Sequence, residues 1–318
     1  MRYSSERINR IAADNRYQEL INASEAKHIL QFENLVRMIT ESHRHSLNKN
    51  ITDAVLITGP SSSGKTTTSK LVAAMLEEQG FHVILVSFDD YYYDTDYIRE
   101  LQGKPADAPM EELDLECPEA FDIAYFKEQM GAFLSGETVT LPVFDFLSKK
   151  RVPGRTVTPS DRDVIILEGI HALNPIVTEG VPFSKTFKVY ICPFDTYSAP
   201  GVRAVMKPQD VRFMRRSVRD QVGRNSDLMK TLSMWPSVRA GEEKYIKPMK
   251  AYADFFFNSS LEYEICLLKY RFMKMVKVLD ASQLAGLKEC FPLEVLEAFC
   301  EIEQADVPEG SIFREFYK

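Results

Sequence analysis

A turn at residues 59–66, Gly-Pro-Ser-Ser-Ser-Gly-Lys-Thr, fits the pattern G-x-x-x-x-G-K-[ST] without deviation. An apolar run at residues 54–57 precedes it, and a helical pattern over residues 65–79 follows it. In that order, backbone N–H groups can surround a phosphate while the new helix directs its positive end at the same place. The sequence therefore predicts a phosphate-binding loop whose nucleotide contacts come from Gly59, Pro60, Ser61, Ser62, Ser63, Gly64, Lys65, Thr66 and Thr67.

Four apolar runs predict the strands of a sheet. They lie at residues 54–57, 83–86, 164–167 and 187–191, and helical segments separate most of them. Runs of this kind are typical of parallel strands that are buried on both faces. We therefore expect an α/β fold of the phosphate-loop NTPase type, with a mostly parallel sheet flanked by helices. Further patterns predict helices at residues 18–40, 121–135, 211–222, 260–278 and 293–303, and a strand at 138–141.

The predicted organisation has two parts, an N-terminal helical extension over residues 1–50 and a phosphate-loop domain over residues 51–318. The domain contains an insertion at about 91–160, a lid at about 211–226 and a helical C-terminal tail. The formal net charge of −7 argues against a protein that coats nucleic acid. No apolar stretch approaches the roughly 18 residues of a membrane span. The five cysteines are scattered, which favours reduced thiols in a cytoplasmic protein.

Carboxylates follow two of the predicted strands. Asp89 comes after the run at 83–86, and Glu168 comes directly after the run at 164–167. Because ligands gather at the carboxyl ends of strands in such a sheet, Asp89 is a candidate proton acceptor for an attacking hydroxyl. Glu168 and the Thr66 hydroxyl are candidate ligands of Mg²⁺, and Lys65 can reach the β- and γ-phosphates. A plain acidic turn that caps a strand is the alternative for Asp89.

An arginine stripe occupies one face of the helix predicted at 211–222. Its members are spaced i, i+3, i+4 and i+7, at Arg212, Arg215, Arg216 and Arg219. Four guanidinium groups on one face repel one another unless anions approach them, and a triphosphate would meet that need. Two alternatives stay open: a face that is paired with carboxylates, and a patch that binds RNA.

A second cluster follows the predicted strand at 138–141. Phe144 and Phe146 flank an acid, and the basic run 149–151 comes after them. Aromatic faces can stack on a planar base. The alternative is a half-buried strand that ends in an exposed turn.

The order of these motifs resembles the uridine kinase and phosphoribulokinase family of phosphate-loop kinases. The order is phosphate loop, Ser-Phe-Asp-Asp-Tyr-Tyr, Pro-Val-Phe-Asp-Phe with a trailing arginine, Ile-Leu-Glu-Gly-Ile-His and Arg-Arg-Ser-Val-Arg-Asp, over roughly residues 51–270. Segments 252–259 and 307–316 extend the resemblance to a bacterial branch that is usually labelled uridine kinase. It implies Asp89 as the general base, Glu168 near magnesium, Tyr92, Phe144 and Phe146 at the nucleoside, and Arg216, Arg219 and Arg224 near the phosphates.

Two positions depart from the family pattern. Glu116 stands where an acid followed by His-Pro holds the ribose hydroxyls, and Lys149 replaces a histidine that reads the pyrimidine. A lysine can donate a hydrogen bond to a carbonyl but cannot accept one. The basic residues Lys149 and Arg151 would also suit an anionic acceptor.

The expected function is therefore transfer of the γ-phosphate of Mg-ATP to the 5′-hydroxyl of a nucleoside, most plausibly uridine or cytidine. Two alternatives remain: a kinase of another small hydroxylated metabolite, such as a phosphorylated sugar or pantothenate, and a non-catalytic protein that senses nucleotides or binds RNA. We expect no membrane association, no nucleic-acid partner and a possible homo-oligomer.

Overall fold

The computed structural model describes residues 1–43, 53–145, 148–160, 163–183, 185–223 and 226–317. Its centre is a five-stranded parallel sheet with the strand order β10–β7–β2–β6–β3. The strands are β2 (Asp53–Thr58), β3 (His82–Ser87), β6 (Asp163–Glu168), β7 (Thr186–Cys192) and β10 (Phe255–Asn258). The parallel α/β sheet that the apolar runs predict is thus confirmed, and β10 adds an edge strand that they do not predict.

Apolar side chains project from both faces of this sheet. Along β2, Val55 and Ile57 belong to one buried cluster, whereas Ala54 and Leu56 belong to a second. Helices α2 (Tyr17–His43), α3 (Lys65–Glu78), α7 (Pro208–Gly223) and α9 (Glu264–Val276) contribute to the first cluster. Helix α5 (Ile123–Leu134) and the antiparallel hairpin of β4 (Val139–Asp145) and β5 (Lys150–Val157) contribute to the second. Both faces are therefore covered, as the alternation along a buried parallel strand requires.

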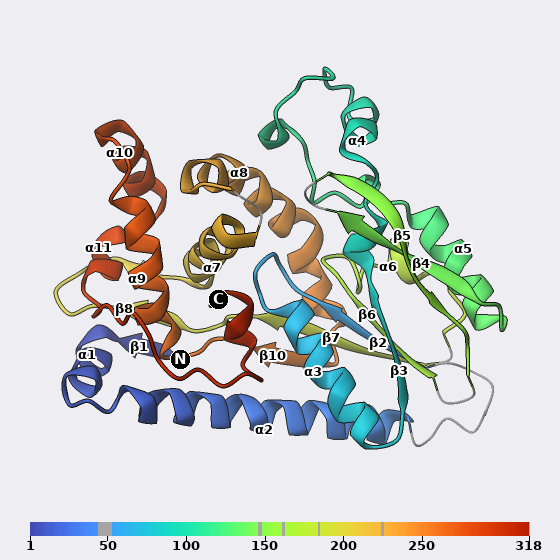
Figure 1. Cartoon of the computed structure of the whole chain (residues 1–318), viewed down its shortest axis with the longest axis horizontal. Coiled ribbons are helices and arrows are strands. Elements are labelled where there is room, and N and C mark those ends of the chain that lie inside the picture. Colours follow the sequence, from blue (N-terminus) through green and yellow to red (C-terminus); the bar gives the residue numbers. More distant parts are fainter. Residues whose placement is uncertain (44–52, 146–147, 161–162, 184, 224–225, 318) are drawn as a thin grey trace.

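The remaining elements connect and extend these layers (Figure 1). A small sheet joins β1 (Arg2–Ser4), β8 (Thr196–Ser198) and β9 (Val205–Met206). The other helices are α1 (Ser5–Ala13), α4 (Thr95–Leu101), α6 (Pro175–Thr178), α8 (Leu228–Gly241), α10 (Ala281–Cys290) and α11 (Leu293–Glu297). Short helical turns occur at η1 (Phe88–Tyr91), η2 (Met110–Glu112), η3 (Pro118–Ala120), η4 (Glu242–Ile246), η5 (Lys247–Tyr252) and η6 (Ile312–Glu315).

Several predicted helices are present with shifted ends. The helix predicted at 18–40 is α2, whose buried Leu20, Leu35 and Val36 pack in the first cluster. The segment predicted at 293–303 is helical only over α11, and the sequence predicts neither α8 nor α10. Within the described residues, no helix combines the length and apolar character that a membrane crossing needs.

Candidate functional site

The predicted phosphate loop links β2 to α3 and depends on two glycines. Gly64 has a φ of 94°, in the left-handed region that side chains disfavour. A Cβ on Gly59 would lie 2.0 Å from the Ile191 carbonyl oxygen, so the loop could not approach β7 with any other residue there. Buried arginines hold the loop from the other side, since Arg212 and Arg215 donate to the carbonyl oxygens of Ser61 and Ser62.

A cavity of about 570 Å³ opens above this loop at the carboxyl ends of the strands. It joins most of the residues that the sequence analysis singles out. Those that line it are Ser61, Ser62, Ser63, Gly64, Lys65, Thr66, Asp89, Tyr92, Glu116, Phe144, Lys149, Glu168, Arg216 and Arg219. Gly59 and Pro60 belong to the loop itself, with the Pro60 carbonyl oxygen 3.4 Å from Lys65 Nζ. The cavity is large enough for small-molecule ligands.

Glu168 and Asp89 face each other across the loop end of this cavity. Glu168 Oε1 accepts hydrogen bonds from Thr66 Oγ1 at 3.2 Å and from Ser87 Oγ at 3.0 Å. Burial and, to a lesser extent, the nearby Asp89 charge raise the pKa of Glu168 to about 7, against the opposing charge of Lys65. A Cβ on Gly169 would lie 2.8 Å from Phe88 Cβ and 3.2 Å from Asp89 Oδ1, so this glycine lets the segment that carries Asp89 lie close to the end of β6.

The donor set fits a magnesium ion that also binds phosphate oxygens. Within the described residues, Asp89 Oδ1 and Glu168 Oε2 are buried without a hydrogen-bond partner, beside the Thr66 hydroxyl. Unpaired carboxylate oxygens at such depth are costly unless a cation approaches them. In the same described part of the chain, no cluster of three His, Cys, Asp or Glu residues could hold a metal by itself. Mg²⁺ commonly takes one or two carboxylates and completes its shell with water and phosphate, which is what these residues offer.

Glu116, Tyr92 and Phe144 also line the cavity. The Oε2 of Glu116 is buried and unpartnered within the described residues, and burial raises the pKa of this carboxyl to about 7, against the opposing charges of Arg216 and Lys65. The rings of Tyr92 and Phe144 have centroids 5.5 Å apart. The cavity therefore also offers two aromatic rings and one further carboxylate.

His171 supports Glu116 and is missing from the predicted site. Burial lowers the pKa of His171 to about 4, so its ring is neutral and Nε2–H donates to the Glu116 carbonyl oxygen at 2.8 Å. The sequence held a signal for it, because the motif Ile-Leu-Glu-Gly-Ile-His at 166–171 ends in this histidine. Ser87, Asp220 and Glu315 also line the cavity without having been predicted.

The arginine stripe divides into two pairs. Arg212 is buried and paired with Glu242 at 2.5 Å, and Arg215 is buried and paired with Glu264 at 2.6 and 2.9 Å. Arg216 and Arg219 reach the cavity, where Arg216 Nη1 donates to Ser61 Oγ at 3.1 Å. The expectation that all four face an anionic ligand is therefore wrong for Arg212 and Arg215, because they do not line the cavity and are buried against Glu242 and Glu264.

Two other predicted residues do not line the cavity, and two more cannot be placed. Arg151 does not line the cavity: its guanidinium is paired with Asp122 at 3.0 Å and lies over the ring of Tyr125, so it fastens the hairpin to α5. The Thr67 hydroxyl donates to Glu315 at 3.1 Å and also does not line the cavity. Phe146 and Arg224 lie outside the described residues.

Comparison with known proteins places the chain among kinases. Two similar proteins are named uridine kinase: one from Borrelia turicatae is 32% identical over 200 residues, which are 62% of this chain and 82% of that protein. The other, from Lactobacillus helveticus, is 29% identical over 212 residues, which are 66% of this chain and 88% of that protein.

A solved structure shares the fold. It is a putative fructose transport system kinase from Silicibacter sp. TM1040, with a TM-score of 0.50 and 19% identity over 71% of this chain and 98% of that one. The model of the phosphoribulokinase / uridine kinase family matches residues 54–265, which include the phosphate loop, Asp89, Glu168 and the arginines of α7. Since that match covers more than half of the sequence, this chain is a kinase that belongs to the phosphoribulokinase / uridine kinase family.

Proposed function

We propose that this kinase transfers the γ-phosphate of ATP to the 5′-hydroxyl of a nucleoside, uridine or cytidine. The observation that carries the proposal is the single cavity that joins Lys65 and the phosphate loop to Asp89, Phe144 and Glu116. The phosphate loop and Lys65 suit a triphosphate, whereas Phe144, Tyr92 and Glu116 suit a sugar with a planar base, because aromatic faces stack on bases and carboxylates accept from hydroxyls. The similar proteins named uridine kinase support the same acceptor.

Each group has a defined part in this proposal. Asp89, a carboxylate that lines the cavity, accepts the proton of the attacking hydroxyl. Lys65, Arg216 and Arg219 stabilise the charge on the transferring phosphoryl group. This electrostatic stabilisation is stronger where water is excluded. Glu168 and Thr66 would hold Mg²⁺, which neutralises charge on the phosphates when it is bound. Glu116 binds ribose hydroxyls, and Phe144 and Tyr92 contact the base.

A second candidate is a kinase of an anionic acceptor, such as a phosphorylated sugar. The specific observation is Lys149, which lines the cavity near Phe144. Arg151 no longer supports this candidate, since Asp122 neutralises it. The arginine stripe no longer supports the RNA-binding alternative either, because two of its arginines are buried in ion pairs.

The test is ADP release from Mg-ATP with a panel of uridine, cytidine, purine nucleosides, phosphorylated sugars and pantothenate. Turnover with uridine or cytidine and none with the anionic acceptors is the expected result. Preference for phosphorylated sugars, lost in Lys149→Ala, would support the second candidate instead. Lys65→Ala is the control for contaminating kinases, since a signal that survives it does not come from this site.

A further inference from the structure

The short helix η6 (Ile312–Glu315) lies against the phosphate loop, although it lies outside residues 54–265 of the family match. Figure 1 shows this helix, in red, beside the first turns of α3 and close to α7. A Cβ placed on Gly64 would lie 3.6 Å from Ile312 Cδ1, in ordinary van der Waals contact. A segment far from the loop in sequence therefore forms part of the loop's immediate surroundings.

Glu315 brings a carboxylate into this position. Its Oε2 accepts from Thr67 Oγ1 at 3.1 Å, and its Oε1 lies 3.4 Å from Nη1 of Arg219. The side chain is 19% exposed and lines the cavity. Its two partners come from the two helices that flank the phosphate site, α3 and α7.

Arg219 is held between two carboxylates. Asp220 Oδ1 accepts from its Nε at 2.9 Å, and Glu315 contacts its Nη1. A guanidinium has five N–H donors, so these contacts leave donors for a phosphate oxygen. An arginine side chain has about 2 kcal/mol of rotamer entropy to lose, and holding it in advance lowers the cost of the next hydrogen bond.

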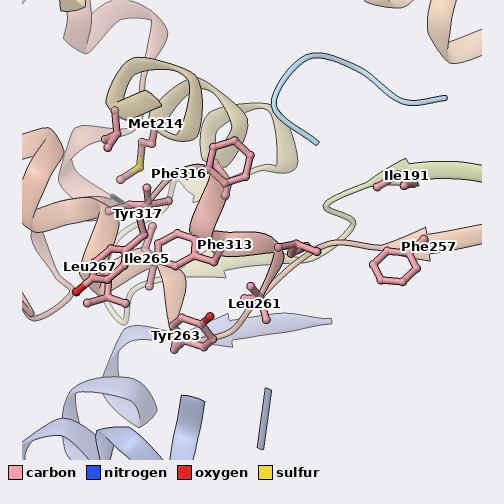
Figure 2. Close-up of a cluster of buried hydrophobic side chains, with 14 of the residues drawn as sticks. Ile191, Met214, Phe257, Leu261, Tyr263, Ile265, Leu267, Phe313, Phe316 and Tyr317 are labelled. Atoms are coloured by element: carbon pink, nitrogen blue, oxygen red, sulfur yellow. The ribbon is translucent and has the colours of Figure 1, made fainter. Parts of the chain in front are cut away.

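The segment that carries Glu315 is firmly packed. Phe313 makes an edge contact with Tyr263 at a centroid distance of 5.6 Å, and the Arg215 guanidinium lies 5.0 Å from the ring centroid of Phe316. Figure 2 shows Phe313 and Tyr317 gathered with apolar side chains of α9 in one buried cluster. Ser311 Oγ donates to Glu25 of α2 at 2.6 Å, which ties the segment to the N-terminal helix. These contacts fix the backbone on which Glu315 stands.

We propose that Glu315 is a positioning residue of the nucleotide site, which holds the Arg219 guanidinium in place for the phosphates of ATP and is itself fixed to the start of α3 by the Thr67 hydroxyl. This inference rests on the proposed use of ATP. The alternative predicts the opposite effect on ATP binding. A carboxylate that merely lay near the phosphates would repel them, and its removal would strengthen ATP binding. Positioning predicts weaker binding after removal, so the sign of the change decides between the two.

The experiment measures ATP affinity by titration calorimetry, together with KM and kcat, in Glu315→Ala and Glu315→Gln. We expect the dissociation constant and the KM for ATP to rise about tenfold in Glu315→Ala, as for the loss of one charged hydrogen-bonding partner. Glu315→Gln keeps a hydrogen-bond acceptor for Thr67, so its dissociation constant for ATP should lie between those of wild type and Glu315→Ala. The KM for the phosphoryl acceptor should not change in either variant. Glu309→Ala is the matched control, because Glu309 is an exposed acid of the same segment.

Unchanged or tighter ATP binding in both Glu315 variants would overturn the inference. If Glu315→Ala lowers the melting temperature, the test uses Glu315→Gln instead, which we expect to melt at the same temperature as Glu309→Ala. If the wild-type protein does not bind ATP, both the proposed function and this inference are wrong. A wild-type protein that binds ATP as tightly as both variants sinks this inference alone.

Discussion

Asp89 and Asp90 are neighbours in sequence but differ in what surrounds them. Asp90 Oδ1 accepts from the Phe144 backbone N–H at 2.9 Å, and burial, aided by the Asp89 charge, raises its pKa to about 6. Asp89 instead lines the cavity, with Oδ1 unpartnered in the described part of the chain. Asp89→Asn should therefore lower kcat by about 10²–10⁴-fold while ATP affinity stays within a few-fold. The isosteric Asp90→Asn is the control, and steady-state kinetics together with ATP-binding measurements on both variants make the comparison. A larger loss of kcat in Asp90→Asn than in Asp89→Asn would contradict the assignment.

Glu116 is a residue whose charge should cost stability. Burial raises its pKa from 4.5 to about 7, so the folded protein binds this proton more tightly than the unfolded chain does. Stability from the protonated form is present below pH 4.5 and is lost as the pH rises through about 7. Glu116→Gln, which cannot ionise, should therefore gain melting temperature relative to wild type between pH 5 and pH 8. The corresponding gain in the free energy of unfolding is about 3 kcal/mol at most. A difference between the two proteins that stays constant across this pH range would contradict the raised pKa of Glu116.

Helix α7 shows at the scale of an element how one face can serve two purposes. Arg215 is fully buried with Glu264, so Arg215→Met leaves an uncompensated buried carboxylate and should cost about 3–5 kcal/mol in urea unfolding. Arg216 reaches the cavity beside Ser61, so Arg216→Met should lower kcat and lose less stability. Unfolding curves and kinetics on both variants check this division. Equal stability losses in the two variants would show that the helix is not divided in this way.

The same element shows what sequence patterns can and cannot predict. Helical spacing places four arginines on one face, but their partners, Glu242 and Glu264, come from elements 30 and 49 residues further along the chain. Apolar runs predict four central strands because burial on both faces leaves a strong signal. Strand β10 has only four residues, and α8 contains Pro236, so neither gives a comparable pattern. Motif order identifies the cavity residues, whereas the ion pair of Arg151 depends on tertiary packing.

At the scale of the whole molecule, the site joins parts that lie far apart in sequence. The region matched by the family model supplies the phosphate loop, Asp89 and Glu168, while η6 brings Glu315 to the same cavity. The segment that carries η6 is tied to α2 through Ser311 and Glu25. Residues 61–66 and Glu315 line one cavity, so ligands there contact the core and the C-terminal segment together. Binding of a nucleotide should consequently stabilise the fold as a unit.

Thermal unfolding with ligands tests this linkage. A ligand that binds only the folded state stabilises it by RT ln(1 + [L]/Kd), about 2.7 kcal/mol at a hundredfold excess over Kd. Mg-ATP should therefore raise the melting temperature of wild type, and Mg²⁺ alone should not, because the described residues offer it too few ligands. ATP with a chelator should give a smaller shift, since Asp89 and Glu168 then face the phosphates without a cation. Lys65→Ala should lose most of the shift, and an undiminished shift in that variant would place the nucleotide outside the loop.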